Sequence, residues 1–91
     1  MFKHIVMWKL TEDVGQKIKK DLENLNSLDC VQKMEVGLDT SKKEASFDVV
    51  LYSEFENEDA FAEYFKHPEH KKIVDFLKTV VKDRVVVDYN V

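Results

Sequence analysis

Alternating apolar and polar residues predict a β-strand at the start of the chain, in the segment FKHIVMWKL (2–10). Successive side chains of a strand point to opposite faces, so one face carries Phe2, His4, Val6, Trp8 and Leu10. The other face carries Ile5 and Met7 between two lysines. The strand therefore presents apolar residues on both of its faces.

A spacing of three to four residues follows, which is typical of an amphipathic helix. The apolar residues that would share its buried face are Val14, Ile18, Leu22 and Leu25. Thr11 is expected to cap this helix, with Glu12 and Asp13 in the first turn, where the helix dipole favours acidic side chains.

Three further strands are predicted. VQKMEVGLDT (31–40) and FDVVLYSEF (47–55) form two of them, with a polar turn between. RVVVDYNV (84–91) is predicted to close the chain as the last strand. The pattern between the third and last strands is helical, so the predicted order is βαββ, a broken helix and β.

The break in this second helical region lies in the segment EYFKHPEH (63–70). Asn57 is the predicted cap of the helix before the break. The apolar side of that helix carries Phe61, Tyr64 and Phe65. Proline disrupts a helix interior but suits the first helical position, so a new helix is expected to begin at Pro68 with His67 as its cap. Its inward side is expected to carry Ile73, Val74, Leu77, Val80 and Val81.

Helices can cover only one face of such a sheet. The apolar residues left on the other face are Ile5, Met7, Val50, Tyr52 and some valines of the last strand. One register of that strand adds Val85, Val87, Tyr89 and Val91 together. An exposed apolar patch of this size marks an interface. We therefore expect a homodimer in which two sheets pack face to face.

Composition limits the classes of function and partner. The 91 residues predict a single domain (1–91), and the net charge of −4 argues against nucleic-acid binding, which needs a basic surface. Cys30 is the only cysteine, so no internal disulfide is possible. No apolar run is long enough for a membrane span, and Met1 leads into a strand rather than a signal peptide. We therefore expect a cytoplasmic protein without a membrane partner.

Taken in order, FKHIVMWKL, MEVGLD, FDVVLYSEFENEDAFAEYFKHPEH and VVVDY resemble the stress-responsive A/B barrel domain (Dabb) family. YFKHPEH, combined with KHIV and VDY, is the most specific part of this resemblance. The resemblance implies an α+β, ferredoxin-like βαββαβ fold with an antiparallel sheet, which pairs as a dimeric α/β barrel. One departure is Asp29-Cys30, where the family often has Pro-Gly before the second strand.

The resemblance also implies candidate site residues. A plant branch of the family acts as a polyketide cyclase, in which a tyrosine and a histidine drive an aldol condensation. These two residues match Tyr64 and His70, and a first-strand histidine of that branch matches His4. A further histidine, in the third strand of that branch, has no counterpart in SFDVVLYSE. Trp8 lies on the same strand face as His4 and is included as a candidate ligand-binding residue.

The residue types suit this chemistry. An imidazole such as that of His70 can act as a general base near neutral pH. The Tyr64 hydroxyl can donate to a carbonyl and stabilise a developing enolate. The alternative is that these residues, with His4 and Trp8, belong to the core and that their polar atoms bind water or backbone. The histidine spacing does not match a zinc site, so no metal or other cofactor is expected.

Three functions follow from these observations. The first is a homodimeric protein that binds a small apolar molecule between sheet and helices, with no assured reaction. The second is a cofactor-independent cyclase or lyase with His70 as general base and Tyr64 as hydrogen-bond donor. The third is dimerisation alone, with side chains filling the space between sheet and helices.

Overall fold

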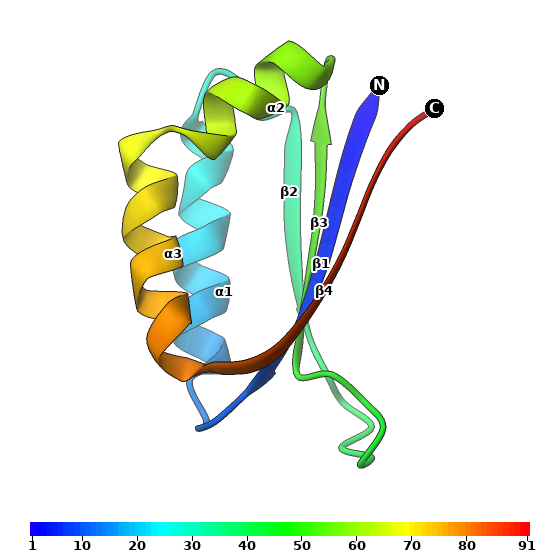
Figure 1. Ribbon diagram of the computed structural model, residues 1–91, viewed down its shortest axis with the longest axis vertical. Coiled ribbons are helices and arrows are strands. Elements are labelled where there is room, and N and C mark those ends of the chain that lie inside the picture. The colour runs from blue at the N-terminus through cyan, green and yellow to red at the C-terminus, as the bar shows by residue number, and fades with distance from the viewer.

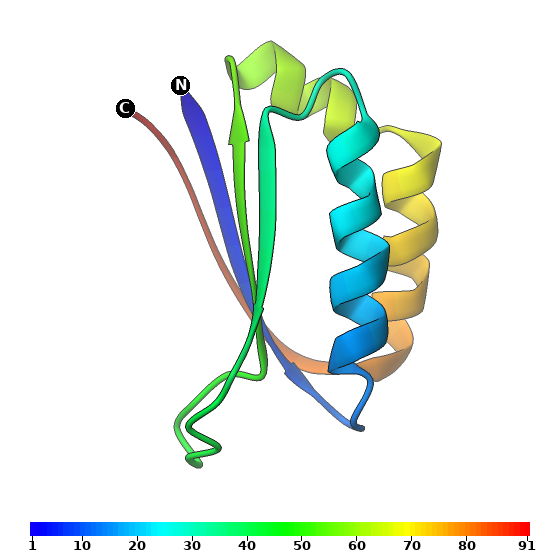
Figure 2. The ribbon, with the colours of Figure 1, turned by 180° about the vertical axis from the view of Figure 1, so that it is seen from behind.

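Four strands form one antiparallel sheet in the computed structural model, which describes residues 1–91, and the helices lie together on one face of that sheet (Figures 1 and 2). In chain order the elements are β1 (Phe2–Leu10), α1 (Gly15–Glu23), the 3₁₀ helix η1 (Asn24–Ser27), β2 (Lys33–Leu38), β3 (Val49–Phe55), α2 (Glu58–Phe65), α3 (Pro68–Val80) and β4 (Val81–Asn90). The predicted order of elements, including the broken helix, is confirmed.

The first strand lies inside the sheet, whose strand order is β2-β3-β1-β4. β1 pairs antiparallel with β3 on one side and with β4 on the other. This register places His4 opposite Asp88 and Trp8 opposite Arg84. The two ends of the chain consequently lie close together (Figure 1), and the Val91 amide donates to the Met1 carbonyl at 3.0 Å.

The face of β1 that was predicted to point inward does so. Phe2, His4, Val6 and Trp8 are all buried. They pack with Ile18, Leu22 and Leu25 from the predicted helical stripe, and with the inward residues of β3, which are Val49, Leu51, Ser53 and Phe55. The core therefore lies between the sheet and the helix layer.

The predicted N-cap of α1 is wrong. The helix begins at Gly15, its cap position is Val14, and no side chain caps it. The Thr11 amide and hydroxyl instead donate to the Val80 carbonyl, at 2.7 and 3.1 Å. Thr11 thus joins the end of β1 to the end of α3 and is not available as a cap.

The helix break follows the prediction. The Asn57 side chain caps α2 by accepting from the Ala60 amide at 2.9 Å. Pro68 opens α3, and the His67 ring caps it by accepting from the Glu69 amide at 3.1 Å. Phe65, which was expected on the apolar side of α2, is instead 57% exposed, and its ring packs against Phe61 and His70.

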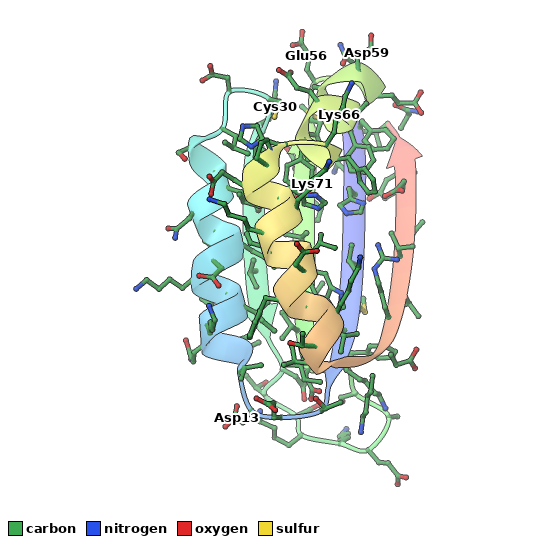
Figure 3. The ribbon with its side chains drawn as sticks, turned by 60° about the vertical axis from the view of Figure 1, so that its left-hand side comes forward. Asp13, Cys30, Glu56, Asp59, Lys66 and Lys71 are labelled. Atoms are coloured by element: carbon green, nitrogen blue, oxygen red, sulfur yellow. The ribbon has the colours of Figure 1, made fainter.

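The last strand begins three residues earlier than predicted, at Val81, directly after α3. No helix covers β4, which lies to one side of the helix layer in Figure 3, and all of its residues except half-buried Val81 are exposed. Val85 and Val87 flank the open face of β1, where Met7 is 40% exposed. The predicted apolar face opposite the helices is therefore present. None of the helices combines the length and the apolar character needed to cross a membrane.

Candidate functional site

A cavity of about 740 Å³ opens between α3, β1 and the start of β4. Its apolar wall is formed by Val6, Trp8, Leu22, Leu51, Tyr64, Phe65, Ile73, Val74, Leu77 and Val81. The other lining residues are His4, His70, Lys71, Asp75, Lys78 and Arg84. All four residues expected to contact a ligand, which are His4, Trp8, Tyr64 and His70, thus lie in the wall of one cavity.

Tyr64 contributes a hydroxyl group that is buried without a hydrogen-bond partner. Its side chain comes from α2, and its ring packs against Phe55 and His70 with centroid distances of 5.1 and 4.6 Å. Burial, with a smaller contribution from Cys30, raises the pKa of Tyr64, so the phenol remains protonated. The site therefore holds a neutral hydroxyl donor with no acceptor within the protein.

His70 lies in the first turn of α3, and its Nδ1 atom is 2.9 Å from the Phe65 carbonyl oxygen. A carbonyl oxygen can only accept, so Nδ1 carries the proton and Nε2 keeps its lone pair. Burial lowers the pKa of His70; the bond to Phe65 acts in the opposite direction, and the nearby His4 lowers the pKa further. His70 is thus a neutral imidazole with Nε2 available as a base.

His4 forms a hydrogen-bonded pair with Asp88, through Nδ1 of the ring and Oδ1 of the carboxylate. The two residues lie opposite each other on β1 and β4. Burial lowers the pKa of His4, Asp88 opposes this effect, and the positive charge of Arg84 adds to the lowering. Nδ1 donates to the carboxylate, so the neutral ring keeps its lone pair on Nε2.

Sequence reasoning missed the role of Asp88. Asp88 was not among the candidate site residues, and its hydrogen bond to the His4 ring was not predicted. The register of the two strands could have indicated this pair. If the first and last strands pair antiparallel with their ends aligned, Asp88 lies opposite His4. The charged side chains Lys71, Lys78 and Arg84 were also missed as lining residues.

The site combines an apolar wall, a hydrogen-bond donor and a proton acceptor. The apolar wall can bury the body of a small molecule, the Tyr64 hydroxyl can donate to an oxygen atom, and His70 Nε2 can accept a proton. No three His, Cys, Asp or Glu side chains cluster in a way that could hold a metal ion.

The chain is similar to a known protein family and to solved structures. The family model described as Stress Responsive A/B Barrel Domain matches residues 2–91. A dimeric protein of unknown function with a ferredoxin-like fold, from Bacteroides fragilis, is 34% identical with a TM-score of 0.87, over 99% of this chain and 95% of that one. No curated protein matches the chain in sequence.

Two more distant structures share the fold. A Dabb family protein with a ferredoxin-like fold from Mesorhizobium loti is 21% identical, with a TM-score of 0.83 over 99% of this chain and 95% of that one. The hydroxynitrile lyase from Passiflora edulis is 20% identical, with a TM-score of 0.83 over 99% of this chain and 92% of that one. These likenesses confirm the predicted α+β, ferredoxin-like fold.

Replacing Tyr64 with phenylalanine tests whether the hydroxyl lacks a partner in the free protein. A buried, unpaired polar group destabilises a fold by about 1–3 kcal/mol, so Tyr64→Phe is expected to raise the free energy of unfolding by about 1 kcal/mol. Urea denaturation measures the change. Tyr52→Phe is the matched control, because the Tyr52 hydroxyl donates to Glu54 at 2.5 Å and its removal brings no such gain. A clear loss of stability in Tyr64→Phe would contradict the prediction.

Proposed function

The chain belongs to the stress-responsive A/B barrel domain (Dabb) family, and we propose that it acts as a homodimer that binds a small, largely apolar molecule in the cavity between sheet and helices. The observation that carries this proposal is that Tyr64, a residue of the cavity wall, has a buried hydroxyl without a hydrogen-bond partner. Buried polar groups are nearly always paired, so an orphaned hydroxyl at a cavity favours a ligand that supplies the acceptor.

The size of the cavity supports the same function. A volume of about 740 Å³ lies within the usual range of small-molecule sites, roughly 300–1,000 Å³, and the wall is largely apolar with few polar groups. A space of this size argues against the alternative in which side chains fill the gap between sheet and helices. The ligand that fits best is an apolar molecule with one oxygen acceptor, such as a carbonyl compound.

Cofactor-independent catalysis is the second candidate function. It is favoured by the bond from His70 Nδ1 to the Phe65 carbonyl, which leaves Nε2 free to remove a proton. With the substrate carbonyl bound to Tyr64, a proton on the adjacent carbon would pass to His70 Nε2, and the electron pair left behind would form an enolate. Such an enolate is the intermediate of aldol cyclisation and of its reverse, carbon–carbon cleavage.

The homodimer is supported by two observations. The Bacteroides fragilis relative, at 34% identity, is described as dimeric. The sheet face opposite the helices carries exposed apolar side chains, among them Met7, Val85, Val87 and Tyr89. Packing two such faces together would bury this surface around a two-fold axis.

Filling the cavity is expected to abolish ligand binding. N-phenyl-1-naphthylamine, a neutral apolar dye that fluoresces when it leaves water, is expected to bind the protein and to lose most of its affinity for Val74→Trp, because Val74 lines the cavity. Ala62→Trp is the control, since Ala62 is exposed on α2 and does not line the cavity. Fluorescence titration measures both. Unchanged binding to Val74→Trp, or no binding to the wild-type protein, would contradict the proposed function.

A charge on the open sheet face is expected to break the dimer. Val86 and Val87 are neighbours on β4 with similar exposure, 46% and 52%, but they point to opposite faces of the sheet. Val87→Lys is therefore expected to give a monomer in multi-angle light scattering at micromolar concentration, whereas Val86→Lys, on the helix side, stays dimeric. A monomeric wild-type protein, or equal effects of the two substitutions, would contradict this prediction.

The second candidate function predicts a pH-dependent proton transfer. In D₂O, the protein is expected to catalyse deuterium exchange at the carbon next to the carbonyl of an apolar ketone such as 2-decanone, and His70→Gln is expected to abolish it. Only the neutral imidazole is a base, and burial lowers the pKa of His70 below its usual value of about 6.5. The exchange rate should therefore stay constant above about pH 6.5. It should fall only at a lower pH, where His70 becomes protonated.

The measurement is proton NMR of the ketone from pH 5 to 8. His67→Gln is the control, because His67 caps α3 and is not among the residues that line the cavity. Exchange that survives in His70→Gln would rule out His70 as the base, and no exchange in the wild-type protein would leave ligand binding as the function.

A further inference from the structure

Three basic side chains line the cavity, and none of them forms an ion pair. Lys71 and Lys78 come from α3, where Figure 3 shows Lys71 near the beginning of the helix, and Arg84 comes from β4. The ion pairs of the structure join other residues. Asp75, between the two lysines along α3, is the only acidic residue in the wall. Basic charge thus gathers at the cavity although the chain carries a net charge of −4.

Two of the three basic groups, Lys78 and Arg84, lie toward the end of the cavity away from His70, whereas Lys71 directly follows His70. His70 lies in the first turn of α3 and Lys78 in the last, and the rise per residue of a helix separates them by about 12 Å. β4 begins directly after α3, and Arg84, which lies opposite Trp8 in the sheet, lines the same cavity as Lys78. The cavity therefore has one end with Tyr64 and His70 and another with Lys78 and Arg84.

We propose that the ligand is a small organic acid whose carboxylate binds between Lys78 and Arg84. Its apolar body lies along α3, and an oxygen at its other end accepts a hydrogen bond from Tyr64. This inference rests on the proposed ligand-binding function and specifies the class of ligand. Hydrogen bonds between charged partners are about twice as strong as neutral ones, so the two basic groups contribute both affinity and orientation.

Long basic side chains also have another use, because their methylene stems can cover an apolar wall while the charged end stays in water. That role needs the stem and not the charge. Methionine retains an unbranched, largely apolar side chain without charge, so Lys78→Met and Arg84→Met separate the two roles. Lys72→Met is the matched control, since Lys72 pairs with Glu69 on α3 and does not line the cavity.

Two dyes that differ by one sulfonate group test the inference. N-phenyl-1-naphthylamine is neutral, whereas 1-anilinonaphthalene-8-sulfonate carries a negative charge on the same ring system and stands in for an acid. The double variant Lys78→Met/Arg84→Met is expected to raise the Kd of the sulfonate by about tenfold and to change that of the neutral dye by less than about twofold. Raising the NaCl concentration should likewise weaken the binding of the sulfonate dye and leave the binding of the neutral dye unchanged. Retained binding of the neutral dye shows that the variant is folded.

Competition then tests the carboxylate itself. Decanoate is expected to displace the sulfonate dye from the wild-type protein at a lower concentration than 1-decanol does, and the double variant is expected to lose this preference. Equal changes in the Kd of both dyes, or displacement by the alcohol as readily as by the acid, would overturn the acid-binding inference and leave the ligand-binding function intact. If neither dye binds, the proposed function fails and this inference fails with it.

Discussion

The antiparallel pairing of the first and last strands is the constraint on which most of this structure depends. α3 passes into β4 without a loop, so the register of β4 against β1 also determines where α3 ends. Thr11 holds this junction by donating two hydrogen bonds to the Val80 carbonyl. The same register sets Asp88 opposite His4 and brings Arg84 into the cavity wall. The pairing of these two strands thus forms one wall of the cavity and places the polar side chains His4 and Arg84 in it.

The central strand has two apolar faces, and this explains how the fold and the assembly are related. One face is covered by helices of the same chain, while the other leaves Ile5 and Met7 facing away from them. No helix of this chain covers that second face. A second copy supplies the missing cover in the proposed dimer, so the sequence of β1 encodes a core on one side and an interface on the other.

Periodicity predicted most of the fold because burial follows local spacing. The alternation in β1, the stripe that includes Ile18 and Leu22, and the restart at Pro68 can each be recognised in a short window of sequence. The candidate site was predicted less completely because its contacts join residues far apart in the chain. The bond from His4 to Asp88 spans 84 positions, and no local pattern reveals it. Thr11 was misassigned for the same reason, since its partner Val80 is a distant residue.

The helix break decides which nitrogen of His70 is free. In an uninterrupted helix the Phe65 carbonyl would accept from the amide of residue 69, but that amide donates to the ring of His67. The carbonyl released in this way becomes the acceptor that binds His70 Nδ1. The extended backbone at His67, ahead of Pro68, therefore sets the tautomer of His70 by leaving the Phe65 carbonyl without a helical donor. A substitution at position 68 that let the helix continue would return the Phe65 carbonyl to a backbone hydrogen bond and take the acceptor away from His70 Nδ1.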